Sequence, residues 1–147
     1  MMKKSFVITL LSMLFMAAGA TAQAQTSEEA GVREAIEHYF QGQATGVGDH
    51  FRKAFHPDAK LFFIRDGKFS TWTLDEYVSR ASGKPAADEA ERKRSITNID
   101  ISGNAAIVKV LLDYPSVRFV DYMSMLKVDG QWKIVNKTFY AEPKKRS

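Results

Sequence analysis

The chain contains no cysteine, and this absence removes several kinds of site at once. Without thiols it can form no disulfide, no thiolate metal site and no cysteine nucleophile. Histidine is almost as scarce, with three in 147 residues, at positions 38, 50 and 56. No two of them have the spacing that brings metal ligands together on one element. We therefore expect no metal site and no bound cofactor.

The sequence also lacks an apolar run long enough to cross a membrane. The longest run, 6–18, is shorter than the roughly 20 residues that a spanning helix needs. Lys3 and Lys4 precede this run, and the Ala-x-Ala patterns 20–22 and 22–24 follow it. This order is typical of a cleaved secretory signal. We predict a signal peptide over 1–24 and export to the periplasm or medium. Without a cysteine at the cleavage point, a lipoprotein is excluded.

The remaining stretch, 25–147, is large enough for one domain with one core. The whole chain has 21 basic and 17 acidic residues, and removing Lys3 and Lys4 leaves 19 basic residues, a net charge of +2. Part of that excess lies in the terminal segment 144–146. Such a balance does not favour nucleic acid as a partner.

Helical patterns dominate the first half of the domain. Thr26 and Glu29 have capping-box spacing, and apolar residues then recur at helical intervals, which predicts a helix from Ser27 to about Ala44. Glycines at 42, 46 and 48 are expected to break it. Asp49 can cap a short second helix, which Pro57 would end.

The pattern then changes to strands and tight turns. Asp-Gly pairs at 66–67 and 129–130, Gly103-Asn104 and Pro115-Ser116 all have turn chemistry. Thr73 and Glu76 repeat the capping-box spacing and predict a helix over 74–81, followed by a mobile polar loop over 82–94. Strands are expected over 60–65, 68–72, 95–102, 105–114, 118–128 and 131–140. Helices followed by an antiparallel meander indicate an α+β fold.

Several local strings carry a resemblance to a known family. They are Tyr39-Phe40-x-Gly42, Gly48-Asp49, 55–59 (FHPDA), 101–106 (ISGNAA), Asp121-Tyr122 and 126–137 (LKVDGQWKIVNK). Together with the element order, they resemble the lumazine-binding-like branch of the nuclear transport factor 2-like superfamily. The resemblance implies a cone-shaped, curved antiparallel sheet with N-terminal helices packed across its concave face. A pocket for a small molecule would lie inside the cone.

Candidate pocket residues follow from that shape and from side-chain chemistry. Buried tyrosine and tryptophan carry a polar atom that needs a partner, and a carboxylate on an apolar strand is perturbed or paired. The candidates are Tyr39, Phe63, Trp72, Tyr77, Asp121, Asn136 and Tyr140. Alternation on the last strand places Asn136 and Tyr140 on the face of Trp132. Alternation leaves open whether Asp121, which shares a face with Phe119 and Met123, points inward.

An acid–base mechanism has weak support from the sequence. In ketosteroid isomerase, a member of the superfamily, the base follows an Asp-Asp-Ala string, and the matching position here is Phe63, which cannot take a proton. His56 with Asp121 is the remaining pairing for a dehydratase-like reaction, although His56 is better explained as a residue that caps a helix end. Asp113 and Arg118 are explained by a cross-strand ion pair.

Three functions stay open at this point, and we assign no catalytic residue. The first is binding of a small apolar or aromatic molecule without catalysis. The second is an acid–base enzyme, which requires a buried carboxylate or histidine within hydrogen-bonding reach of a tyrosine. The third is an interaction module that forms a homodimer through the open sheet face.

Overall fold

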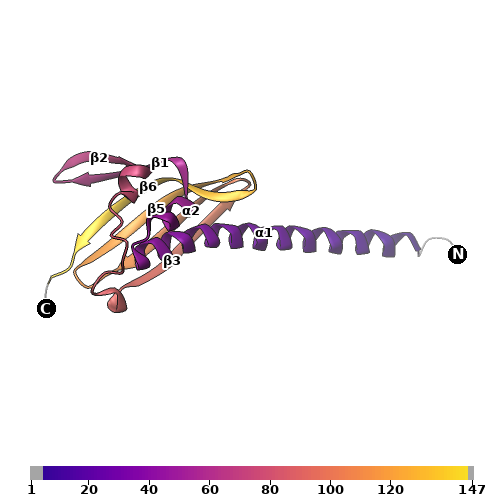
Figure 1. The fold of residues 1–147 in the computed structure, drawn as a ribbon. Helices are drawn as coiled ribbons and strands as arrows, with labels where there is room; N and C mark the ends of the chain where they lie inside the picture. The colour runs from indigo at the N-terminus through magenta and orange to yellow at the C-terminus, as the bar shows by residue number, and fades with distance from the viewer. Residues whose placement is uncertain (1–4, 146–147) are drawn as a thin grey trace.

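The computed structural model describes residues 5–145, with side chains from residue 25 onward. Lys3 and Lys4, the positive start of the predicted signal peptide, lie outside the described residues. The first helix, α1 (Ser5–Thr45), is longer than expected, and its N-terminal half extends away from the rest of the molecule (Figure 1). The prediction that a helix begins at Ser27 was therefore wrong. Helical backbone runs straight through the Thr26–Glu29 spacing. No helix among the described residues is long and apolar enough to cross a membrane.

Gly42 does not break α1, contrary to expectation. The helix continues through Gly42, and the missing side chain there lets α1 approach the Phe51 ring of the next helix, with which a Cβ would collide. The helix ends three residues later, where Gly46 adopts a positive φ of 69°. The second helix, α2 (Gly48–Ala54), then packs against α1.

The second helix differs from the prediction at both ends. Its N-cap is Val47, with no side-chain cap hydrogen bond, so Asp49 lies within the first turn. It ends at Ala54, where Phe55 turns to extended backbone, rather than at Pro57. Pro57 instead lies inside strand β1 (Phe55–Arg65), in the stretch where the register with the neighbouring strand is irregular.

The remaining strands confirm the expected meander. They are β2 (Lys68–Thr73), β3 (Lys93–Ser102), β4 (Ala105–Asp113), β5 (Val117–Val128) and β6 (Gln131–Pro143). Positive φ angles at Asp66 and Gly67 form the β1–β2 hairpin turn. Between β2 and β3 lie α3 (Leu74–Val78), with the Thr73–Glu76 capping box in place, and a short 3-10 helix, η1 (Glu89–Glu91).

Six strands form one curved, open sheet in the order β2-β1-β6-β5-β4-β3. The α+β cone with helices across its concave face is confirmed, with one difference. The pairing of β1 with β6 is parallel, whereas every other pair of neighbours is antiparallel. The helices cover one face of this sheet, whose two edge strands are β2 and β3.

The core lies between α1 and the concave face of the sheet. Val32, Ala35, Ile36 and Tyr39 follow the i, i+3, i+4, i+7 spacing of one helix face, and all four are buried. Facing them are alternate residues of the central strands, Val108, Val110, Met123, Met125 and Ile134. Glu28, near the middle of α1, attaches the helix to the sheet by accepting hydrogen bonds from Lys127 Nζ and Trp132 Nε1.

Candidate functional site

Three polar side chains meet inside this apolar core. Tyr39 comes from α1, Asp121 from β5 and Lys137 from β6, and we call them the inner polar cluster. The Tyr39 hydroxyl donates to Asp121 Oδ2 at 2.6 Å, and Lys137 Nζ donates to the Tyr39 oxygen at 2.6 Å. Lys137 Nζ also lies 2.9 Å from Asp121 Oδ2. Asp121 is 0% exposed and Lys137 only 4%, which is rare for these residue types.

A β-bulge explains why Lys137 points inward. Met125 pairs with Ile134 and Ser124 pairs with Asn136, so Val135 is one extra residue on β6. Side chains alternate across a strand, and one extra residue reverses which of them face the core. Trp132 and Ile134 are buried before the bulge, and Lys137 is buried after it.

Burial dominates the electrostatics of the cluster. Loss of solvation lowers the pKa of Lys137, and the Asp121 charge beside it acts in the opposite direction. For Tyr39, burial and then the Asp121 charge raise the pKa well above its usual value. Tyr39 joins the other two side chains, because its hydroxyl accepts a hydrogen bond from Lys137 and donates one to Asp121.

One oxygen of the cluster has no partner. Asp121 Oδ2 accepts from both neighbours, but Asp121 Oδ1 is buried and makes no hydrogen bond. Buried polar atoms in native proteins nearly always have a partner, and leaving one unpaired is unfavourable. This oxygen marks where a hydrogen-bonding group or a proton could be received.

Aromatic rings separate the lysine from solvent. The centroids of Tyr39, Phe139 and Tyr77 lie 4.8, 5.0 and 5.6 Å from Lys137 Nζ. Phe139 stacks on Phe63 at 5.0 Å, and Phe63 contacts Trp72 at 4.5 Å. These rings form a continuous wall from the cluster to the rim of the cone.

A cavity of about 220 Å³ adjoins this wall between α1, α3 and the segment after α3. We call it the α3 cavity; among its lining residues are Gln43, Phe51, Tyr77, Arg80, Lys84 and Arg92. Gln43 Nε2 donates to the Tyr77 hydroxyl at 2.6 Å. Because Tyr77 lines the cavity and also faces Lys137, it stands between the cavity and the inner polar cluster.

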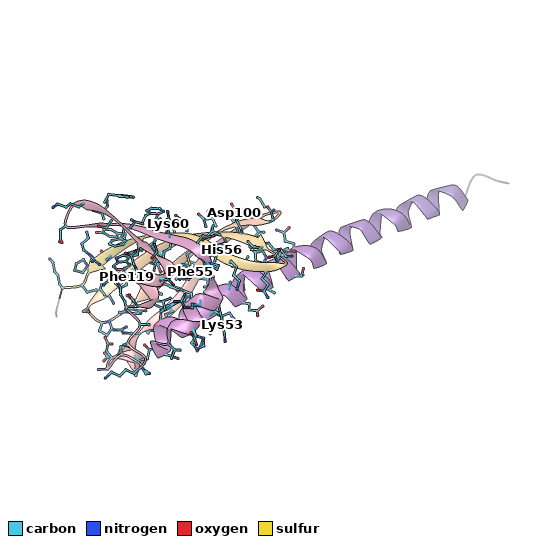
Figure 2. The ribbon with its side chains drawn as sticks, turned by 45° about the horizontal axis from the view of Figure 1, so that its top comes forward. Lys53, Phe55, His56, Lys60, Asp100 and Phe119 are labelled. Carbon is cyan, nitrogen blue, oxygen red and sulfur yellow. The ribbon has the colours of Figure 1, made fainter. Side chains whose placement is uncertain are left out.

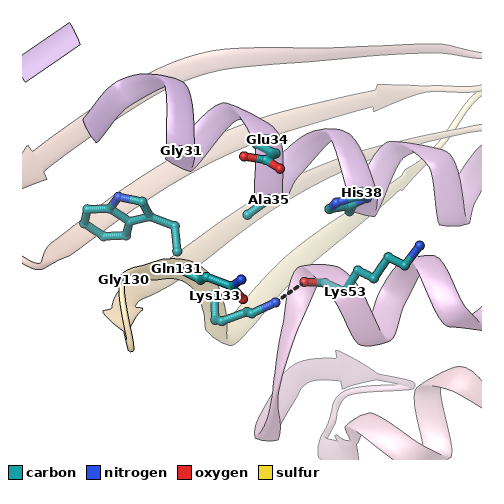
Figure 3. Close-up of a pocket in the computed structure, with 9 residues that line it drawn as sticks. Gly31, Glu34, Ala35, His38, Lys53, Gly130, Gln131 and Lys133 are labelled. Carbon is teal, nitrogen blue, oxygen red and sulfur yellow. Dashed lines mark hydrogen bonds between the residues drawn. The ribbon is translucent and has the colours of Figure 1, made fainter. Parts of the chain in front are cut away.

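Two other hollows lie away from the cluster. A polar groove of about 270 Å³ runs between α1 and the β5–β6 turn, where Lys133 Nζ donates to the Lys53 carbonyl at 2.6 Å (Figure 3). A shallow hollow of about 290 Å³, lined largely by Ile107, Met125, Leu126 and Val135, lies on the sheet. Among residues 25–145, no cluster of three side chains suited to holding a metal ion is present.

The structure places the predicted pocket residues in two groups. Tyr39, Phe63, Trp72, Tyr77 and Asp121 lie on the concave side, in the cluster or its aromatic wall. Asn136 and Tyr140 do not, because the bulge turns them to the outer face, and Tyr140 is 63% exposed. Placing those two residues beside Trp132 was wrong.

His56 does not join Asp121. It lies at the start of β1 next to the buried Phe55 (Figure 2), and its Nδ1 accepts from the Asp58 backbone N–H at 3.2 Å. The cross-strand pair of Arg118 with Asp113 is present, at 3.4 Å.

Sequence reasoning missed Lys137. Strict alternation assigned Lys137 to the face opposite Trp132, and no residue near position 135 predicts a bulge. The available signal was that Lys137 lies two positions before Phe139 and therefore shares a face of the strand with an aromatic ring.

Comparison with known proteins agrees with this geometry. The sequence model of the family described as "Putative lumazine-binding" matches residues 27–140, which is most of the chain. The chain belongs to this family. The match includes the whole inner polar cluster and the α3 cavity.

Solved structures show the same fold. An NTF2-like protein from Shewanella baltica OS155 superposes with a TM-score of 0.73 at 27% identity, covering 81% of this chain and 97% of that one. One from Methylobacillus flagellatus KT has a TM-score of 0.69 at 30% identity, covering 79% and 93%. The chain is also similar to a protein named aldolase FrzH from Cladobotryum sp., at 27% identity over 108 residues, 72% of this chain and 85% of that protein.

Proposed function

We propose that this domain binds a small organic molecule on the concave side of its sheet, in the α3 cavity beside the inner polar cluster. The observation that carries the proposal is the α3 cavity itself, which Tyr77 separates from the cluster that holds the buried, unpartnered Oδ1 of Asp121. The cavity supplies apolar rings from Phe51 and Tyr77 and a few polar groups, which is the usual composition of a small-molecule site. Membership of a family described as lumazine-binding points the same way.

Ligand-dependent thermal shift of the purified protein tests this proposal. A panel should include flavin precursors, steroids, fatty acids and aromatic acids. A binding compound raises the melting temperature as its concentration exceeds the dissociation constant. We expect that shift to be lost in Tyr77→Ala and kept in Lys133→Ala, which changes the separate polar groove. A flat panel with well-folded protein would contradict the proposal and favour an interaction module.

A second candidate is an enzyme that moves a proton next to a carbonyl group. The observation that favours it is the 2.6 Å hydrogen bond between the Tyr39 hydroxyl and the buried Asp121 carboxylate, the arrangement that an acid–base function requires. Asp121 Oδ1 would accept the proton, and the cationic Lys137 would stabilise negative charge developing on the carbonyl oxygen. The similarity to a protein named as an aldolase supports this class of reaction.

Proton exchange distinguishes the enzyme from the simple binder. Carbonyl probes such as phenylpyruvate and acetone are incubated with the protein in D₂O, and deuterium entering next to the carbonyl is followed by NMR. We expect exchange that depends on the protein, is abolished in Asp121→Asn and persists in Asp113→Asn, the exposed control. Equal rates with Asp121→Asn would exclude this role for the carboxylate.

We also propose that two copies associate through the outer face of the sheet. This face exposes Ile107, Tyr122 and Leu126, at 49%, 46% and 41%, beside the shallow apolar hollow. Sedimentation velocity should show a dimer that Tyr122→Asp dissociates and Ile64→Asp, on the β1–β2 hairpin, leaves intact. A monomer at all concentrations would exclude it.

Export is proposed from the sequence pattern of residues 1–24. Intact-mass measurement on protein from the periplasmic fraction of an expressing bacterium should give a chain beginning at Gln23 or Gln25. A full-length chain confined to the cytoplasm would contradict this.

A further inference from the structure

The charged side chains of the α3 cavity are all of one sign. Arg80, Lys84 and Arg92 line it, and no aspartate or glutamate of the described chain does. Like charges around one concave surface reinforce each other and raise the local concentration of an oppositely charged ligand.

One of these three cations is already neutralised. Arg92 Nε pairs with Asp88 at 2.7 Å, and its guanidinium lies 4.3 Å from the centre of the Tyr114 ring. For Arg80 and Lys84, no carboxylate of residues 25–145 lies within ion-pair distance. The cavity therefore has two uncompensated positive charges.

Three carboxylates of α3 and η1 make their hydrogen bonds and ion pairs with other residues. Asp75 pairs with Arg52 at 2.8 Å, and Glu76 accepts from the Thr73 backbone in the capping box. Glu89 makes a two-pronged pair with Arg94. None of them can turn to Arg80 without breaking the bond that it already makes.

The Arg80 guanidinium is also held in place by its surroundings. It stacks over Trp72 with 4.1 Å between the guanidinium carbon and the ring centroid. A planar, stacked guanidinium keeps its N–H edge available and can bind a carboxylate with two parallel hydrogen bonds. Phe51 and the ring of Tyr77 offer apolar contact within the same cavity.

We propose that the α3 cavity selects a small organic anion, an aromatic or apolar body carrying a carboxylate, with Arg80 as its charge partner. This inference rests on the proposed binding function and narrows its ligand class. At about 220 Å³ the cavity suits a compound of one ring rather than a steroid or a long fatty acid.

Benzoate and benzamide test the inference because they share shape and differ in charge. Isothermal titration should show benzoate binding at least about tenfold more tightly than benzamide, an advantage that shrinks as salt screens the exposed charges. Arg80→Gln should remove the preference. Arg65→Gln is the matched control, because Arg65 stacks on the same Trp72 at 5.1 Å but does not line the cavity. It should keep the preference.

The possible results distinguish the anion inference from the proposed binding function. Benzamide binding as tightly as benzoate, or a preference that survives Arg80→Gln, overturns the inference. If neutral compounds of the thermal-shift panel bind and benzoate does not, the anion inference fails and the binding function stands. If neither benzoate nor any panel compound binds, both fail.

Discussion

At the scale of single residues, the most informative feature is a lysine in the core. Lys137 and Asp121 stabilise each other inside the protein, where each alone would be an uncompensated charge. Removing one partner of a buried pair is more damaging than replacing both with apolar residues. Losing either Lys137 or Asp121 alone should therefore lower the free energy of unfolding. A buried pair that is so costly to disrupt is consistent with a role in function.

Lys137→Met should lower the free energy of unfolding by about 3–5 kcal/mol, because it leaves the Asp121 carboxylate buried without a counter-charge. The double variant Asp121→Leu with Lys137→Met should recover a large part of that loss. Urea denaturation measures both. As a control, Arg33→Gln removes an exposed pair with Glu29 and should cost about 1 kcal/mol or less. A Lys137→Met protein as stable as the parent would show that the pair is absent in solution.

Tyr39 gives the molecule a dependence on alkaline pH. Burial and the Asp121 charge raise its pKa in the folded state, so its stabilisation is complete below the usual tyrosine pKa of about 10 and is lost as pH rises toward the folded value. Between about pH 10 and 12 the parent should lose stability more steeply than Tyr39→Phe. Lys137 and Tyr77 face the same site in both proteins, so their contributions largely cancel in the comparison. Parallel slopes would contradict the assignment.

The sequence predicted which residues share a face of the strand with Asp121, but it did not predict whether that face points into the core. Alternation grouped it with Met123, and both prove to be buried. Neither face of β5 was apolar enough to identify the core side. The Tyr39 contact joins residues 82 positions apart, and no local pattern carries that information.

At the scale of elements, local chemistry predicted most of the architecture. Turn pairs such as Asp66-Gly67 and the Thr73–Glu76 capping box fixed where elements meet, because those backbone conformations depend on nearby residues. The bulge at Val135 and the β1–β6 pairing were not predictable. Both depend on how distant strands fit together.

The α1–α2 contact predicts an effect at Gly42. A methyl group there would come within 2.5 Å of the Phe51 ring. Although alanine favours helix, Gly42→Ala should therefore lower stability by about 1–3 kcal/mol. Gln41→Ala, on the exposed side of the same turn, should change it by at most about 0.5 kcal/mol. Thermal or urea unfolding of both variants measures these changes. Adding Phe51→Leu to Gly42→Ala measures the energetic coupling between positions 42 and 51. A Gly42→Ala protein more stable than the parent would show that α1 and α2 can move apart at this contact without cost.

At the scale of the whole molecule, the sheet is completed by segments from opposite ends of the domain. Residues 60–63 of β1 pair with residues 136–139 of β6, and the β1–β2 hairpin is attached to the rest of the sheet through this seam. The seam also brings Phe63 against Phe139, next to Lys137.

Two truncations isolate the seam. A chain ending at Asn136 loses most of the seam and Lys137, and should show no cooperative unfolding and weak near-ultraviolet circular dichroism. A chain ending at Ala141 keeps every β1–β6 pair and should unfold cooperatively. If the shorter chain also folds, the seam is dispensable.

The parallel seam has a consequence for the newly made chain. As the ribosome extends the polypeptide, β1 must wait for about 70 further residues before its partner strand exists, and long sequence separations slow folding. Until then the edge of β1 that pairs with β6 in the folded domain has no partner strand. The β1–β2 hairpin can therefore join the rest of the sheet only after β6, which follows every other strand of the sheet along the chain, has been synthesised.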